Sequence, residues 1–455
     1  MNRSIKQAQN ELTRRIEQLR AIFPECVVDE EDTVRVDFEK LKEFLGAPET
    51  NEFVWMGKRA ASAEARRETY KSLRPWRAES RNWKDTRNIY VEGDNLDFLK
   101  LARQDLVGQI DLIYIDPPYN TGRGTFVYRD DFSDSKGDGS SNWASMFYPR
   151  VLLAREFLKD SGAIFVSIDD REHANAIKIM DEIFGRQNFV ATIMWESKRE
   201  AKGIPPKSMS VTNHEYILCY SKNGSYRFVG DMRNVSDGFA NPDSDPRGPW
   251  KRQYLQRFGQ GFRERTIVDP ATGRAYTFET PYTQEKLNRW IAEGRVIFPT
   301  PPYKYPARKE FFNEYDNPYK PIVTSWGLFS TKVGSEKLKS LFDGKKVFDY
   351  SKPLDLMTTL LRRAMRSDGL VMDFFAGSGT IGHAVMALNA EDGGARRFIL
   401  VQAPESCGRR SVAYKLGYND ISAICRERLR RAGDLLLSES ARESLDVGFR
   451  AYRIE

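Results

Sequence analysis

The chain of 455 residues contains little cysteine and little histidine. Its four cysteines are Cys26, Cys219, Cys407 and Cys425; no two of them have CxxC spacing, and only three histidines are present. A zinc site and a disulfide framework need more of these residues at closer spacing. We therefore predict no metal site, and reduced, mostly buried thiols.

Long apolar runs are also missing. No stretch of eighteen apolar residues occurs, so we expect no membrane span. The polar N-terminus lacks the apolar core of a signal peptide, which favours a soluble intracellular protein. The length suggests two or three domains. The net charge of +7 fits a polyanionic partner, although charge alone is weak evidence.

Two parts of the chain alternate between strand and helix patterns. The expected strands cover 89–91, 110–115, 163–168, 191–195, 215–220, 371–374 and 398–401, and the expected helices cover 96–101, 144–158, 172–184, 353–365 and about 380–388. Strands that alternate with helices are typical of a doubly wound, mostly parallel sheet. We therefore predict an α/β fold.

Residues 1–85 and 225–345 do not follow this alternation. In the first segment we expect helices over 4–23 and 38–45, which form a packing or dimer face. They precede a basic run, 58–87, that is either a phosphate-binding surface or a solvated linker. The second segment holds eleven of the 21 prolines, 21 aromatic residues and 20 Lys or Arg against 14 Asp or Glu. That composition predicts a separately folded insertion with an aromatic and basic surface, although any single aromatic residue is more often core than surface.

The first motif with chemical meaning is Asp116-Pro117-Pro118-Tyr119, directly after the expected strand 110–115. Ligands of open α/β sheets bind beyond the carboxyl ends of strands. Two prolines fix the backbone and remove its N–H donors, but their carbonyls remain acceptors. A carboxylate beside a rigid carbonyl suits an exocyclic amino group, which has two hydrogens to donate. The alternative is a proline-rich turn without function.

The second motif is a glycine loop between the expected strand 371–374 and a helix. It consists of Asp373, Phe374, Phe375, Ala376, Gly377, Ser378, Gly379 and Thr380. Small residues at a strand–helix turn let backbone approach a ligand closely. No lysine follows the second glycine, so the loop is not a P-loop. Gly382 completes GxGxxG spacing, so the spacing alone also permits a nicotinamide cofactor.

Together the two motifs resemble the amino-methyltransferases of DNA. The catalytic motif precedes the insertion and the cofactor motif follows it, an order similar to the beta class and most similar to the Mod subunits of type III restriction–modification systems. The resemblance covers about 55–225 and 347–430. It also includes the segments Asn88–Leu96, Phe126–Phe132, Ile164–Asp170, Asn213–Leu218 and Arg396–Val401.

The resemblance implies a site-specific transfer of methyl from S-adenosyl-L-methionine to N6 of an adenine flipped out of double-stranded DNA. Asp116 and the Pro117 carbonyl would accept the two amino hydrogens, and Tyr119 would stack on the base. The cofactor would contact the glycine loop, Asp94, and Lys352 and Pro353 at its methionine end. Gln402 stands where many relatives place an acidic ribose-binding residue, and Glu405 is a possible substitute.

The same resemblance divides the chain into 1–85, a catalytic half 86–224, a target recognition domain 225–345 and a cofactor-binding half 346–455. It implies double-stranded DNA as a partner, a homodimer, a possible restriction subunit, and a location in prokaryotic cytoplasm at the nucleoid. Typical Mod subunits have a longer insertion, which puts the restriction subunit in doubt.

Several alternatives stay open. N4-cytosine methylation uses the same geometry, although such relatives more often carry Ser than Asp at position 116. Methylation of RNA or of a glutamine amide usually goes with Asn there. A binding protein of the same fold without catalysis is the alternative of another class. Asp169 and Asp170 are more often helix caps than a metal pair, and His214 is more often structural than catalytic.

Overall fold

A computed structural model describes residues 16–20, 22–30, 33–37, 40–41, 53–122, 132, 139–199, 210–300, 304–439 and 444–455. The chain divides into two compact units, 1–54 and 55–455. In the first unit η1 (Pro24–Cys26) precedes a hairpin of β1 (Val27–Glu30) and β2 (Thr33–Val36). Residues 16–20 and 40–41 are helical, and most of the expected helices 4–23 and 38–45 lies outside the described residues.

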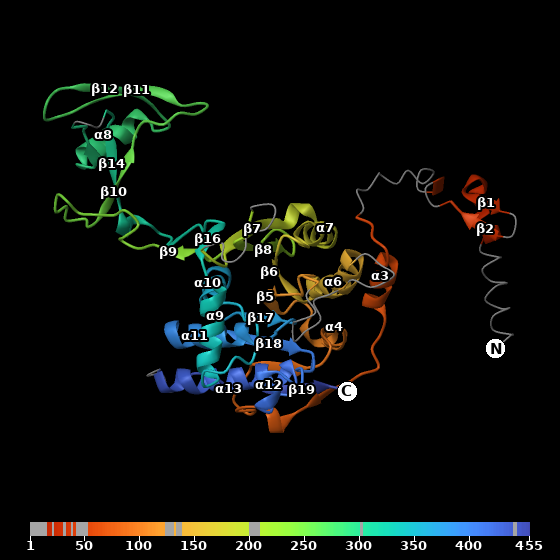
Figure 1. The fold of residues 1–455 in the computed structure, drawn as a ribbon. Helices are drawn as coiled ribbons and strands as arrows, with labels where there is room; N and C mark the ends of the chain where they lie inside the picture. Colours follow the sequence, from red (N-terminus) through yellow and green to blue (C-terminus); the bar gives the residue numbers. More distant parts are fainter. Residues whose placement is uncertain are drawn as a thin grey trace, which may run out of the picture. The chain divides into compact units, whose positions relative to one another are not determined.

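Ten strands of the second unit form one sheet in the order β16-β7-β8-β6-β5-β17-β18-β4-β19-β3 (Figure 1). They are β3 (Leu73–Pro75), β4 (Ile89–Glu92), β5 (Ile110–Ile115), β6 (Leu158–Ile168), β7 (Phe189–Glu196), β8 (His214–Ser221), β16 (Ser325–Leu328), β17 (Leu370–Asp373), β18 (Arg397–Gln402) and β19 (Arg450–Ile454). β8 is antiparallel to both neighbours and β3 to β19, and the other neighbouring pairs are parallel. The predicted α/β fold with a mostly parallel sheet is confirmed.

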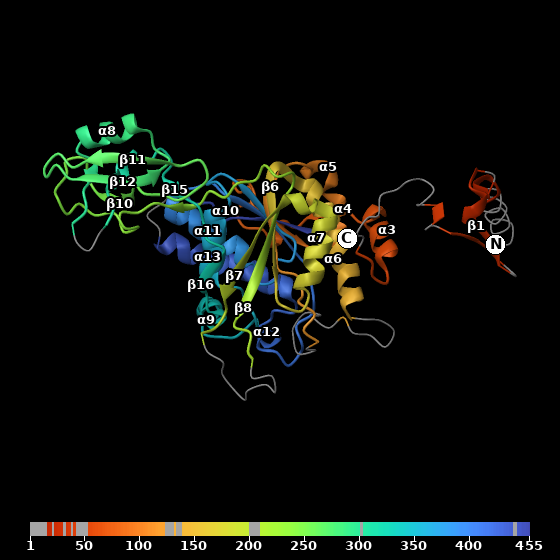
Figure 2. The same cartoon turned by 90° about the horizontal axis from the view of Figure 1, so that it is seen from above.

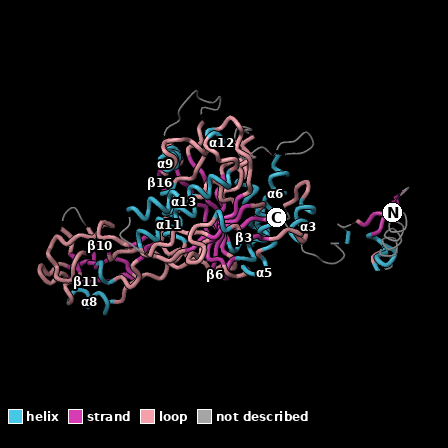
Figure 3. The backbone as a smooth tube through the Cα atoms, turned by 90° about the horizontal axis from the view of Figure 1, so that it is seen from below, coloured by secondary structure: helices cyan, strands magenta, loops and turns pink. Residues whose placement is uncertain are grey.

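Helices cover both faces of this sheet. Figure 2 shows α10, α11 and α13 on one side and α4, α6 and α7 on the other, and Figure 3 shows the strands as a twisted layer between them. The helices and 3₁₀ turns of this domain are α3 (Lys58–Arg66), η2 (Arg77–Glu79), α4 (Asn95–Leu101), α5 (Arg103–Leu106), α6 (Gly139–Phe157), α7 (His173–Phe184), η3 (Arg186–Asn188), α9 (Thr331–Leu341), α10 (Leu354–Ala364), α11 (Thr380–Asp392), α12 (Val412–Lys415) and α13 (Ile421–Glu439). Because the central strands are buried on both faces, their sequences are nearly continuous apolar runs.

The insertion forms small sheets of its own. Its elements are β9 (Asp231–Met232), β10 (Trp250–Tyr254), β11 (Arg263–Val268), β12 (Ala275–Thr280), α8 (Gln284–Ala292), β13 (Val296–Ile297), β14 (Ala307–Phe311), η4 (Phe312–Glu314) and β15 (Tyr319–Lys320). They pair as β10-β14-β13, β11-β12 and β15-β9. A separate apolar cluster of Leu255, Ile267, Phe278, Leu287 and Trp290 supports them. Some of the aromatic residues are therefore core, as expected for most of them.

The structure moves two of the expected boundaries. Both ends of 225–345 belong to the main domain: Tyr226 and Trp326 are buried in its core, and β16 pairs with β7. Residues 55–85 also belong to it, because α3 packs on α6 and β3 pairs with β19. The basic run is therefore part of the folded domain and not a solvated linker. Within it the ring of Trp76 packs against the guanidinium of Arg453, whose Cζ lies 3.7 Å from the ring centre.

Candidate active site

A large cavity lies at the carboxyl edge of the sheet. Its volume is about 1100 Å³, and residues that directly follow β4, β5, β6, β17 and β18 line it. The parallel strands end at this edge, which is where open α/β sheets bind ligands. β8 runs the other way, so its first residues, His214 and Glu215, reach the same cavity.

The cavity brings together both predicted motifs, which are 257 positions apart at Asp116 and Asp373. They meet because β5 and β17 are paired neighbours in the sheet. The predicted residues that line the cavity are Asp94, Asp116, Pro117, Pro118, Tyr119, Lys352, Asp373, Phe374, Phe375, Ala376, Gly377, Ser378, Thr380, Gln402 and Glu405. Two predicted residues, Pro353 and Gly379, do not line it.

The turn after β5 presents two acceptors to the cavity. The Pro118 carbonyl accepts a hydrogen bond from Trp143 Nε1 at 2.6 Å, which fixes the turn on α6. No donor among the described residues reaches the Pro117 carbonyl. Asp116 uses Oδ1 for its contacts with protein, and within the same part of the chain nothing contacts Oδ2. An unused carboxylate oxygen and an unused carbonyl therefore stand on consecutive residues.

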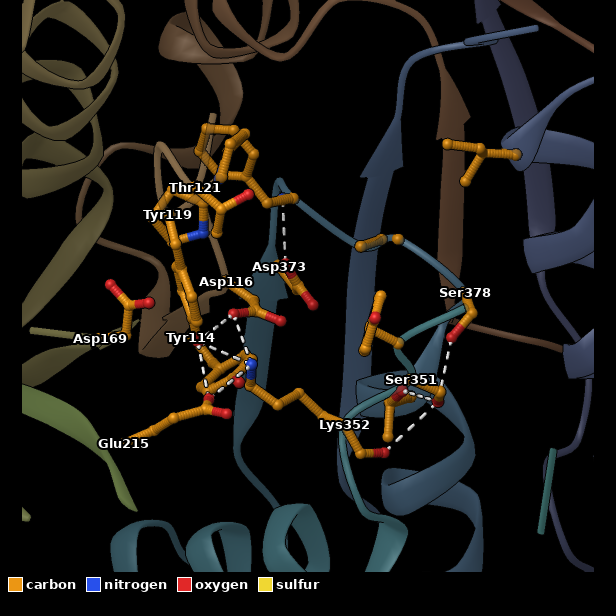
Figure 4. Close-up of a pocket in the computed structure, with 18 of the residues that line it drawn as sticks. Tyr114, Asp116, Tyr119, Thr121, Asp169, Glu215, Ser351, Lys352, Asp373 and Ser378 are labelled. Carbon is orange, nitrogen blue, oxygen red and sulfur yellow. Dashed lines mark hydrogen bonds and ion pairs between the residues drawn. The ribbon is translucent and has the colours of Figure 1, made fainter. Parts of the chain in front are cut away.

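Lys352 is the centre of a charged cluster at this turn (Figure 4). Its Nζ lies 2.9 Å from Asp116 Oδ1, 3.2 Å from Glu215 Oε2 and 2.6 Å from the Tyr119 hydroxyl. Burial disfavours the ammonium, but the carboxylates of Asp116 and Glu215 outweigh it and raise the pKa of Lys352 above its usual value. Lys352 therefore remains charged. It contacts the turn at Asp116, whereas the sequence suggested only that its segment closes over the methionine end of the cofactor.

Tyr119 is anchored in the same cluster. Its hydroxyl is 2.9 Å from Asp116 Oδ1 and 3.1 Å from Glu215 Oε2. Burial and then the negative charges of Asp116 and Glu215 raise the pKa of Tyr119 well above its usual value, so the phenol stays protonated. Stacking of its ring on a base stays a prediction.

Glu215 is the principal site residue that the sequence interpretation missed. The segment around it was recognised as part of the resemblance, but no role was given to the carboxylate. An acidic residue at the start of an otherwise apolar strand was the available signal. The signal becomes specific only when β8 is known to be antiparallel, because that direction brings Glu215 to the edge where Asp116 lies.

The glycine loop after β17 is held in a fixed shape. Gly377 and Gly379 have φ values of +54° and +81°, in the region that favours glycine. A Cβ on Gly379 would lie 2.8 Å from Cys425 Sγ, so this glycine allows α13 to pack against the loop. Asp373 accepts a hydrogen bond from Phe375 N at 2.9 Å, and burial raises the pKa of its carboxyl well above the usual value.

Gln402 supports the loop from the end of β18. Its Oε1 accepts a hydrogen bond from Gly377 N at 2.6 Å, and its Nε2 donates to the Ala403 carbonyl at 3.1 Å. At this position, where an acidic residue was expected to bind ribose, the side chain of Gln402 therefore orients the loop. Glu405 also lines the cavity and remains the candidate for a ribose contact.

We expect Gln402→Ala to weaken cofactor binding by about fivefold to tenfold, because the Gly377 N–H loses its acceptor. Isothermal titration with S-adenosyl-L-methionine measures the effect. Gln109→Ala, a change of the same residue type just before β5 and outside the cavity, is the matched control. Equal affinities of the Gln402→Ala variant and the wild type would show that the loop does not depend on this bond.

Asp94 and Pro353 are both N-cap residues of helices. The Asp94 carboxylate accepts hydrogen bonds from Leu96 N and Asp97 N and so caps α4, while it also lines the cavity. Pro353 is the N-cap residue of α10. Its contact with a cofactor stays a prediction that this geometry does not favour.

The other candidate residues are engaged with protein. Asp169 bonds to Arg171, and Asp170 accepts from Tyr216 and Thr212, so neither caps α7, whose N-cap residue is Glu172. His214 Nε2 lies 2.8 Å from the Tyr216 hydroxyl. Within the described parts of the chain no group of three metal-ligating side chains occurs and no helix is long and apolar enough to span a membrane. All four cysteines are free and buried, as predicted.

Comparison with known proteins shows which family the chain belongs to. A family model described as DNA methylase matches residues 110–418. The Mod subunit of the type III restriction–modification enzyme StyLTI from Salmonella typhimurium is 35% identical over 81% of this chain and 60% of its own length. The EcoPI Mod subunit of Escherichia phage P1 is 30% identical over 90% of this chain and 73% of its own length. The type II methyltransferase M.KpnI of Klebsiella pneumoniae is 31% identical over 76% and 88%.

The chain belongs to the DNA methylase family. The resemblance to Mod subunits that its motifs predicted is confirmed. The chain spans about three fifths of the length of the StyLTI Mod subunit and about three quarters of that of the EcoPI and EcoP15I subunits. Among solved structures, the cytosine-N4-specific PvuII DNA methyltransferase is similar over 77% of this chain and 94% of its own, with a TM-score of 0.39 and 14% identity, a likeness too low to carry an argument.

Proposed function

We propose that the chain is a site-specific DNA methyltransferase that moves a methyl group from S-adenosyl-L-methionine to N6 of a flipped adenine. One observation carries the proposal: the Asp116 turn and the glycine loop line the same cavity. The description of the matching family as DNA methylase supports DNA as the substrate, and the name of the type II methyltransferase M.KpnI supports methyl transfer as the reaction. The names do not specify the base, so adenine rests on Asp at position 116.

The residues of the cavity fit this cofactor. Gly377 has a positive φ, and a Cβ there would meet nothing closer than 3.9 Å, so open space faces the backbone of the loop. Asp373 and Thr380 border that space with acceptors and donors. When bound, S-adenosyl-L-methionine supplies an electrophilic methyl group on its sulfonium.

The amino group would be bound by the two unused acceptors. Asp116 Oδ2 and the Pro117 carbonyl each accept one hydrogen, which turns the nitrogen lone pair out of the ring plane and toward the methyl group. Lys352 and Tyr119 hold the other oxygen of Asp116, so the carboxylate is oriented. The proton that the methylated nitrogen loses passes to Asp116 Oδ2.

The test is methyl transfer from labelled S-adenosyl-L-methionine to unmethylated genomic DNA, followed by nucleoside analysis. N6-methyladenine is the expected product. N4-methylcytosine would keep the mechanism and change the target. Cofactor binding without transfer to DNA would contradict the proposal, and it would favour the non-catalytic alternative or another substrate such as RNA.

We propose double-stranded DNA as the partner of the insertion. Five exposed cations of the insertion have no ion pair within the described residues: Arg257, Arg263, Arg274, Lys286 and Arg289. Exposed arginine and lysine side chains of this kind bind the phosphates of DNA, and the DNA then releases its condensed counterions.

We expect DNA affinity to fall by about 10³-fold between about 50 and about 200 mM salt, because several phosphates would be neutralised. Fluorescence anisotropy with a labelled duplex measures the slope. The double variant Arg257→Ala/Arg263→Ala should reduce the log–log slope by about 2, since each phosphate contact contributes about 1. A slope unchanged by this pair would remove these two side chains from the DNA surface.

We further propose that two copies of the chain form a homodimer. We propose a restriction subunit as an additional partner of this dimer. The Mod names of three relatives support the restriction subunit, and the class resemblance supports the dimer. Light scattering of the purified chain at working concentration tests the dimer, and a monomer would contradict it.

A further inference from the structure

Arg428 is a buried cation without a counter-ion. Its side chain is on α13, 2% of the residue is exposed, and no carboxylate among the described residues forms an ion pair with it. Arg426, two positions earlier on the same helix, is paired with Glu79 at 3.0 Å and Glu92 at 2.5 Å. Burying a charge without a partner is costly, so the arrangement at Arg428 calls for an explanation.

Among the described residues, the hydrogen bonds of the Arg428 guanidinium all go to hydroxyl groups. Its Nη1 donates to Ser351 Oγ at 2.9 Å, Ser378 Oγ at 2.8 Å and Thr380 Oγ1 at 2.8 Å, while its buried Nε has no partner within the described chain. Burial lowers the pKa of Arg428 to about 10, which still leaves it charged at neutral pH. Arg428 therefore forms hydrogen bonds with three neutral side chains instead of an ion pair with a carboxylate of the described residues.

The three hydroxyls stand between this charge and the cavity. Ser351, Ser378 and Thr380 all line the cavity, whereas Arg428 does not. Figure 4 shows Ser351 and Ser378 together on one side of Asp373, with Asp116 on the other side. Thr380 is also the first residue of α11, and the amino end of a 13-residue helix favours an anion. Because Arg428 donates to each hydroxyl oxygen, it polarises these groups to donate onward.

We propose that Arg428 is a positioning residue that supplies the counter-charge for the carboxylate of the cofactor's methionine part, through Ser351, Ser378 and Thr380. The inference rests on the proposed function and names one more residue of its cofactor site. Ser351 directly precedes Lys352, which contacts Asp116. One segment of the chain therefore contributes both to the Asp116 end and to the glycine-loop end of the cavity. The carboxylate thereby supplies, across the three hydroxyls, a negative charge that no ion pair among the described residues gives to Arg428.

The test compares two ligands that differ only in this carboxylate: S-adenosyl-L-methionine and its decarboxylated form. The wild type should bind the first more tightly by about 30-fold or more, because the decarboxylated ligand leaves the buried cation unpaired. Arg428→Met should reduce that ratio to within about threefold of unity while affinity for the decarboxylated ligand is retained, and Arg428→Lys should keep much of it. Titration calorimetry gives all the dissociation constants.

Binding of the decarboxylated ligand also reports whether the variant site is folded. If Arg428→Met fails to fold, Ser378→Ala decides: with Arg428 in place it should lower the ratio by about fivefold, since one mediating hydroxyl is lost. If the ratio of the two ligand affinities is unchanged in the folded variants, the inference is overturned. An equal loss of affinity for both ligands would also overturn it. A wild type that binds neither ligand would instead contradict the proposed function.

Discussion

Asp116→Ala is expected to lower kcat for methyl transfer by about 10³-fold, with cofactor affinity within about threefold of the wild type. Alanine removes Oδ2, one of two acceptors for the amino hydrogens, and leaves the glycine loop in place. The loss should therefore be in kcat and not in binding. Single-turnover transfer of labelled methyl to duplex DNA and calorimetric titration of the cofactor measure the two quantities separately.

Two further variants make the result specific. Asp116→Asn keeps a carbonyl acceptor but loses the charge that Lys352 and Tyr119 hold, so its kcat should lie between those of the wild type and the alanine variant. Asp160→Ala is the matched control, because that carboxylate lies on β6 with 83% of its side chain exposed and outside the cavity. Transfer by Asp116→Ala at more than a tenth of the wild-type rate would remove Asp116 from the chemistry.

The sheet could be predicted because its strands follow local rules. Residues 110–115 and 398–401 are short apolar runs bounded by turns, and β5 and β18 lie there. α13 and β19 were not predicted. The two arginines of β19 are three positions apart, so the strand has no period-2 alternation, and only its pairing between β4 and β3 makes it a strand. Strand pairing between distant segments is a tertiary property that local patterns do not encode.

The motif residues could be found for a similar reason, since each motif is contiguous and directly follows a strand. The residues that complete the site come from elsewhere: Glu215 from an antiparallel strand, and Arg428 from a position on α13 that does not itself line the cavity. Their roles depend on distances to Lys352 and Ser351, which separate elements set. A charged residue in a sequence does not reveal whether it has a counter-ion, and that property distinguishes Arg428 from Arg426.

Replacing Lys352 with methionine is expected to lower kcat at neutral pH by about 10²-fold. In the wild type the ammonium lies 2.9 Å from Asp116 Oδ1 and 3.2 Å from Glu215 Oε2, so it attracts both carboxylates. Without it the negative charges of Asp116 and Glu215 repel each other in a partly buried site. The Asp116 carboxylate then turns away from the orientation in which Oδ2 accepts an amino hydrogen, and transfer slows.

A second substitution separates this electrostatic effect from lost packing. Lys352→Met/Glu215→Gln removes the repelling charge as well as the ammonium, so Asp116 should regain its orientation and kcat at neutral pH should recover by about tenfold. Lys337→Met is the matched control, because Lys337 makes a 2.7 Å ion pair with Asp355 on the surface, away from the cavity. Single-turnover rates of the four proteins at neutral pH test this prediction. If the double variant is as slow as Lys352→Met, the ammonium acts by contact with the substrate and not by orienting Asp116.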